Sequence, residues 1–293
     1  MSAPDILSVV FRAVSFVLLL QAAGIAIFIA MFGRRLSDSF TVIRRLGRIL
    51  AFAAMVAVAG HFFLEGARMA GAMGGAIDPS MQMIALGSST GAAFILRLFG
   101  LTLIAIGLRE GIRTDAAGVT RLVGVVGAFL ALAAFALTGH TSVSPHRAVL
   151  ATLLILHLLV VAFWLGALAP LWLATIREPR ARGAQIVAAF SAIAVWLVPC
   201  ILFAGVGLTL LLVPGWSVFG QPYGKLLLTK GVLFAVPLAV GALNKWRFGP
   251  RIGRAGPEAT SVFRRALAIE YILICAVLAV TAVMTTFYSP EPA

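Results

Sequence analysis

The run RAVLATLLILHLLVVAFWLGALAPLWL, residues 147–173, decides the fold of this chain. It contains no acidic residue, and after Arg147 it contains no charge apart from what one histidine, His157, could carry. A helix needs about 20 apolar residues to cross the roughly 30 Å hydrocarbon core of a bilayer, where backbone groups can bond only within the protein. The run therefore predicts a transmembrane helix with His157 inside it.

The rest of the chain repeats this pattern. Hydrophobic residues make up 61% of it and the mean hydropathy is +1.07, too apolar for a soluble domain of this length. Seven further runs are long enough to span a bilayer: 6–32, 48–68, 88–108, 118–138, 185–213, 225–244 and 266–287. We expect an all-α polytopic membrane protein, a bundle of eight transmembrane helices. It forms one integral membrane domain over 1–293, with four helices in 1–138 and four in 139–293.

The net charge of +13 is distributed unevenly along the chain. Most arginines and lysines fall in alternate connections, after the first, third, fifth and seventh runs, as the positive-inside rule requires of cytoplasmic links. The basic charge therefore orients the protein and does not indicate nucleic-acid binding. Both termini are expected outside, on the periplasmic side of a bacterial inner (plasma) membrane.

The outer half of the predicted bundle collects unusual side chains. His61, Glu65 and Met69 are four residues apart and should share one face of the second helix, and Met73 follows in the outer connection. The stretch TGHTSVSPHR, residues 138–147, adds two more histidines next to an outer connection. Imidazole and thioether groups suit copper. We therefore predict a copper site in this half, with a set of five ligands: His61, His140, His157, Met69 and Met73.

Other interpretations of these side chains remain open. Membrane histidines often serve only in hydrogen bonds between helices, and His146, beside Pro145 and Arg147, is expected to be a surface bystander. Two histidines on facing helices could also hold a b-type haem. Candidate supporting residues are Glu65, Arg97, Trp164, Lys230 and Glu270.

The supporting residues carry specific expectations. Arg97 and Glu65 should form an ion pair between neighbouring helices, since membrane charges are costly when unpaired. Lys230 is expected to extend toward the outer surface and Glu270 toward the inner one. Trp164, seven residues after His157, should lie on the same helix face and either wall a pocket or pack.

The C-terminal half resembles the copper resistance protein D family. The resemblance rests on TGHTS (138–142), LHLLVVAFWLGAL (156–168), FSAIAV (190–195), YGKLLLTKGVLFAVPLAVGALNKWR (223–247) and FRRALAIEYILICAVLAV (263–280). Six residues stand where the family pattern has them: His157, Trp164, Gly166, Lys230, Asn244 and Glu270. The N-terminal half matches mainly in hydropathy and in the Gly60–His61 pair.

This resemblance implies an eight-helix inner-membrane protein that passes copper, as Cu(I) or Cu(II), from periplasm to cytoplasm. Relatives often work with a periplasmic CopC-like copper-binding protein, which here would be a separate chain. The alternatives are a haem-binding electron-transfer protein that uses histidine pairs, and a copper-delivery or assembly factor that transports nothing. We do not expect an enzyme, because no Ser/His/Asp set or pair of carboxylates occurs at a shared depth.

Overall fold

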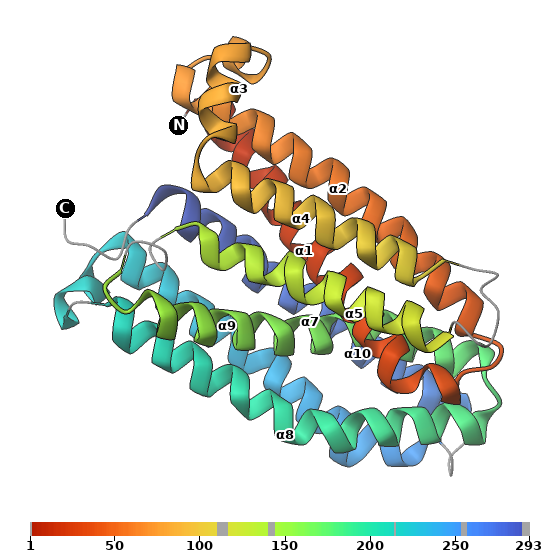
Figure 1. The fold of residues 1–293 in the computed structure, drawn as a ribbon. Coiled ribbons are helices and arrows are strands. Elements are labelled where there is room, and N and C mark those ends of the chain that lie inside the picture. The colour runs from red at the N-terminus through yellow and green to blue at the C-terminus, as the bar shows by residue number, and fades with distance from the viewer. Residues whose placement is uncertain (1, 110–116, 140–143, 214, 253–256, 289–293) are drawn as a thin grey trace.

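The computed structural model describes residues 2–109, 117–139, 144–213, 215–252 and 257–288 (Figure 1). Within these ranges, eight helices are long and apolar enough to cross a membrane. They are α1 (Ala3–Phe32), α2 (Phe40–Ala70), α4 (Ser89–Gly107), α5 (Ala117–Ala133), α7 (Arg147–Arg177), α8 (Arg180–Leu212), α9 (Pro222–Leu243) and α10 (Pro257–Phe287). The prediction of an all-α, eight-span membrane protein is therefore confirmed.

Shorter elements connect or extend these helices. They are the 3₁₀ turns η1 (Gly33–Arg35), η2 (Met73–Ala76), η4 (Ala134–Leu137), η5 (Trp216–Gly220) and η7 (Gly249–Arg251), the π-helical turn η6 (Asn244–Phe248), and the short helix α3 (Pro79–Leu86). Helices α2 and α10 begin about two turns before the apolar runs that predicted them. Apolar residues mark only the lipid-covered part of a helix, and the basic residues before it continue the same helix.

Helix α1 joins the two halves of the bundle. It packs against α2 and α5 of the N-terminal half and against α7 and α10 of the C-terminal half, while α2 packs mainly on α1 and α4 (Figure 1). The closest approach is between α1 and α7, where a Cβ atom on Gly24 would overlap the carbonyl oxygen of Ala162 and lie 2.6 Å from the Cα of Gly166. Small residues permit such close packing of membrane helices, which gain no hydrophobic energy from association in lipid.

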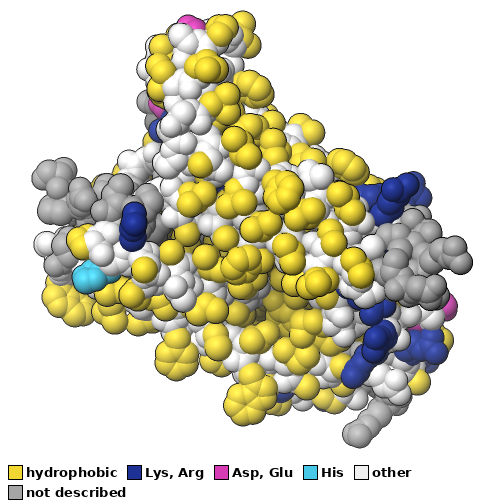
Figure 2. Space-filling view, viewed as in Figure 1, with side chains coloured by type: hydrophobic (Ala, Val, Ile, Leu, Met, Phe, Trp, Pro, Cys, Tyr) yellow, Lys and Arg dark blue, Asp and Glu magenta, His cyan; other side chains and the backbone are white. Residues whose placement is uncertain are grey.

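The two ends of the bundle differ in charge. An apolar surface covers the middle, and most of the visible Lys and Arg side chains gather at the end opposite α3 (Figure 2). The beginning of α1 lies beside the end of α10, since Arg12 bonds to the backbone oxygen of Thr285. An even number of spans puts both helix ends on one side of the membrane, away from the basic links. That this side is the outer one stays a prediction.

Candidate functional site

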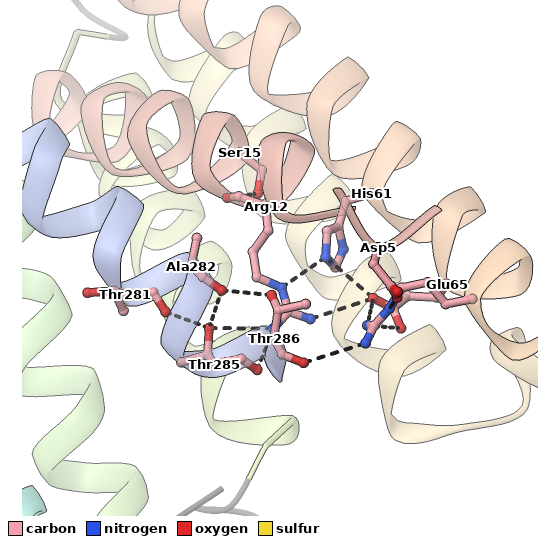
Figure 3. A network of polar contacts seen from close by, with 10 residues as sticks. Asp5, Arg12, Ser15, His61, Glu65, Thr281, Ala282, Thr285 and Thr286 are labelled. Atoms are coloured by element: carbon pink, nitrogen blue, oxygen red, sulfur yellow. Dashed lines mark hydrogen bonds and ion pairs between the residues drawn. The ribbon is translucent and has the colours of Figure 1, made fainter. Parts of the chain in front are cut away.

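His61 lies in a network of charged side chains near the N-terminal end of α1 and the C-terminal end of α2 (Figure 3). Arg12 of α1 donates a hydrogen bond from Nε to Nε2 of His61 over 3.0 Å, and its Nη2 lies 3.5 Å from a carboxylate oxygen of Glu65. Nε2 of His61 lies 3.5 Å from Oε1 of Glu65, one turn further along α2, as the spacing of the two residues predicts. The His61 side chain is only 11% exposed.

A second arginine completes this network. Arg68 contacts Glu65 at 3.2 Å and Asp5 of α1 at 3.4 Å, and it donates to the backbone oxygen of Thr286 on α10. Arg12 likewise donates to the Thr285 oxygen at 2.8 Å. Two arginines thus tie three helices together, α1, α2 and α10. Each arginine pairs with a carboxylate and also donates to a backbone carbonyl at the C-terminal end of α10. Carbonyls at a helix end have no partner within the helix and need another donor in a membrane.

The expected Arg97–Glu65 ion pair is not present, and that prediction was wrong. Arg97 places its guanidinium over the ring of Phe135, 4.3 Å from the ring centre, a cation–π geometry. Its buried Nε has no hydrogen-bond partner in the described part of the chain. Glu65 is instead approached by Arg12 and Arg68, which α1 and the next turn of α2 bring closer.

This network limits what His61 can do in the arrangement observed. Its Nε2 lone pair accepts the Arg12 hydrogen bond, so in the neutral ring the proton is on Nδ1. A metal ion would need one of these nitrogens free and deprotonated. Arg12 and Arg97 both act electrostatically on His61, and positive charge there disfavours a cation. Sequence reasoning missed Arg12, whose signal was a lone arginine inside an apolar run.

His157 has a different environment. Its Nδ1 lies 3.2 Å from the carbonyl oxygen of Ile201 on α8. A carbonyl only accepts, so Nδ1 must carry the proton, and Nε2 keeps its lone pair. A second hydrogen bond of this kind is what orients histidine ligands in metal sites. Lys230 on α9 is close enough to act on His157 electrostatically and is only partly exposed.

The two methionines among the predicted ligands are on the surface. Met69 and Met73, at the C-terminal end of α2 and in η2, are 52% and 45% exposed. His140 lies outside the described residues, and His146 is exposed just before α7. In the described ranges, no group of three His, Cys, Asp or Glu side chains could hold a metal ion. This statement does not cover methionine ligands or His140. The helices of His61 and His157, α2 and α7, both pack against α1, and they make little or no contact with each other.

Glu270 is buried in the C-terminal half, with 2% exposure. It accepts a hydrogen bond from Nε1 of Trp164 at 3.1 Å, and another from the side-chain amide of Asn244 at the start of η6. The expectation that Glu270 extends to the inner surface was wrong. Helix α10 begins thirteen residues before Glu270, which places this residue near the middle of the helix, where Trp164 and Asn244 donate hydrogen bonds to it.

A second buried carboxylate joins two links at the basic end of the bundle. Glu178, between α7 and α8, accepts backbone and hydroxyl hydrogen bonds from both Ser37 and Ser39. Burial alone would raise the pKa of this carboxyl, but the hydrogen bonds from Ser37 and then Ser39 outweigh it and lower the pKa to about 2. Glu178 thus holds the α1–α2 link against the α7–α8 link. Nothing in the sequence pattern pointed to this contact, because its partners are about 140 residues apart.

Comparison with known proteins matches most of the chain. Residues 2–146 match the family model "Copper resistance protein D-like, N-terminal domain", and residues 184–284 match "Copper resistance protein D". The chain is 33% identical over 168 residues to a Bacillus subtilis (strain 168) protein named copper transport protein CutJ. That alignment covers 55% of this chain and 30% of the relative, so the chain spans under a third of that protein. No solved structure matches the chain.

Proposed function

Because the chain belongs to the copper resistance protein D-like family, we propose that this multi-pass membrane protein moves copper from the outer side of the membrane to the cytoplasm. The family match and the copper-transport relative support copper handling. The asymmetry of basic residues supports the orientation, with the basic end in the cytoplasm of a bacterial inner membrane. Copper is here a substrate that passes through the protein.

The observation that carries the site is the hydrogen bond between His157 and the Ile201 carbonyl. It fixes the tautomer and leaves Nε2 as a metal ligand in the middle of an apolar helix, where an ionisable side chain is costly without a function. We assign His157 as the central copper ligand. Its surroundings include the positive charge of Lys230, which weakens cation binding and so favours release over trapping.

Copper would reach His157 from the outer surface. The exposed thioethers of Met69 and Met73 are soft groups that suit Cu(I), and we assign them, with His140, to its capture. His61 becomes a ligand only when Arg12 withdraws from its Nε2, so we assign it a second, conditional role. A CopC-like protein is the candidate donor of the ion on this side.

Copper binding to single-residue variants tests the site. The full chain, purified in detergent, is loaded with Cu(I), and bound copper is measured by mass spectrometry beside a visible spectrum that would reveal haem. We expect His157→Ala to lose the stoichiometric copper, and the matched exposed variant His146→Ala to keep it. Full copper binding by His157→Ala would refute the assignment of this ligand.

Transport is tested separately from binding. Proteoliposomes that contain the full chain should accumulate copper faster than empty vesicles, and His157→Ala should reduce the rate at least tenfold. Stoichiometric binding without accumulation would identify a copper-delivery factor and contradict a permease. A Soret band from the purified protein would instead favour the haem alternative.

A further inference from the structure

Glu270 is a buried carboxylate without a cationic partner in the described chain, and the proposed copper site does not involve it. The carboxylate is 2% exposed, and its two hydrogen-bond donors, Trp164 and Asn244, are both neutral. It lies thirteen residues into a 31-residue helix, about 20 Å along a length of about 45 Å. A carboxylate buried this deeply without a cation is costly, and such groups in membrane proteins commonly bind protons or ions.

No charge in the described part of the chain compensates Glu270. Helix α10 packs against α1, α7, α9, η6 and η7. From α7 and η6 the groups that face the carboxylate are Trp164 and Asn244, and no described residue of α1, α9 or η7 forms a salt bridge with it. Lys245, directly after Asn244, donates instead to the Ser191 backbone oxygen at 3.1 Å. Gly241 of α9 lies beside the carboxylate, since a Cβ added to it would lie 3.7 Å from Glu270 Oε1.

Asn244 fits both protonation states of this carboxyl group. Its amide nitrogen donates to Glu270, while its oxygen Oδ1 is buried and without a partner in the described chain. Asn244 itself is only 7% exposed. An ionised carboxylate needs donors, which the amide nitrogen and Trp164 supply. A protonated carboxyl needs an acceptor for its O–H, and Oδ1 supplies one if the amide turns over.

We propose that Glu270 is a proton-binding site that is protonated in the copper-free protein and releases its proton when copper occupies the bundle. The coupling to copper rests on the proposed function. Trp164 is seven residues beyond His157 on α7, about 10 Å along the helix, and it touches Glu270 directly. A positive charge about 10 Å from a carboxyl group would favour its proton loss by about tenfold at an effective dielectric constant of ~20.

The exchange is a simple acid dissociation. The O–H bond of Glu270 breaks, the proton passes to water, and the carboxylate keeps both electrons. No electron is transferred and copper keeps its oxidation state. The proton returns when copper leaves, so each passage of copper is accompanied by proton release and proton uptake at this residue.

Infrared difference spectroscopy of the purified full chain tests the proton itself. We expect a carbonyl stretch from a protonated carboxyl group at about pH 7, lost in Glu270→Gln and kept in the control Glu258→Gln, an exposed glutamate on the same helix. Trp164→Phe keeps the carboxyl but removes one donor, so its band should shift in frequency. A band that survives in Glu270→Gln, or one unmoved in Trp164→Phe, would overturn the proposal.

Proton release on copper binding tests the coupling. Cu(I) is titrated into weakly buffered protein at about pH 7, where Glu270 is expected to carry its proton and the histidines contribute equally in all three proteins. A tenfold change in an acid dissociation constant releases at most about half a proton, so we expect the wild-type chain and Glu258→Gln to release up to about half a proton more per copper than Glu270→Gln. Equal release by all three would refute the coupling. A wild-type chain that binds no copper would defeat the proposed function, and the infrared band would still decide whether Glu270 holds a proton.

Discussion

Arg12 occupies the nitrogen of His61 that a metal ion would need, through a 3.0 Å hydrogen bond from its Nε. The same guanidinium bonds to the Thr285 backbone oxygen and lies 3.5 Å from Glu65. One side chain thus fixes the tautomer of a membrane histidine and joins three helices. In this arrangement His61 therefore has a structural role between helices, and it could bind copper only after Arg12 moves away.

Replacement of Arg12 should separate these two roles. We expect Arg12→Gln to destabilise the protein by about 1–3 kcal/mol, because Glu65 and the Thr285 carbonyl lose a charged donor. The same change frees Nε2 of His61, so the variant should bind copper more tightly at this histidine. Thermal unfolding in detergent and copper titration measure the two effects. Arg147→Gln, at the exposed start of α7, is the control, and an Arg12→Gln protein as stable as this control would contradict the structural role.

The outer methionines should matter only when copper is scarce. The double variant Met69→Leu, Met73→Leu removes two exposed thioethers and keeps the apolar volume. We expect copper uptake by proteoliposomes to fall several-fold at low Cu(I) and to recover at saturating Cu(I). Met83→Leu, which is 69% exposed in α3, should behave like the wild-type protein. A uniform loss at all copper concentrations would indicate damage to the fold instead of lost capture.

The contact between α1 and α7 should be intolerant of a single methyl group. A Cβ on Gly24 would overlap the backbone of Ala162, and helix backbones cannot yield as a flexible side chain can. We expect Gly24→Ala to lower stability by about 3 kcal/mol or to prevent folding. Gly231→Ala, in α9 with no atom within 4 Å of the new Cβ, is the matched control and should be neutral or slightly stabilising. The midpoint of thermal unfolding compares them.

Glu178 should give the protein a stability that depends on acidity. Its pKa is lowered to about 2 in the folded protein, so its contribution is complete above its unfolded value of about 4.3 and is lost as pH falls toward 2. Glu178→Gln should therefore cost about 2 kcal/mol near neutral pH, through weaker bonds to Ser37 and Ser39. The difference in unfolding midpoint from the wild-type protein should shrink on acidification. A difference independent of pH would exclude the ionised carboxylate as its cause.

The sequence determined the features that depend on local composition. Each apolar run is long enough to span a membrane by itself. The alternation of basic links predicts an orientation without knowledge of which helices adjoin. The spaced polar residues of the C-terminal half, among them His157, Trp164 and Glu270, were sufficient to indicate the copper resistance protein D family before any coordinates were considered. The i,i+4 contact of His61 with Glu65 also follows from helix geometry alone.

Only the tertiary structure decided which polar groups meet. Arg12 takes His61 and Glu65, Arg97 lies over Phe135, and Glu270 binds Trp164 and Asn244. These pairings depend on which helices adjoin and how each is rotated about its axis. Hydropathy cannot predict how a helix is rotated about its axis when the helix is apolar on all sides, because each face can contact either lipid or protein.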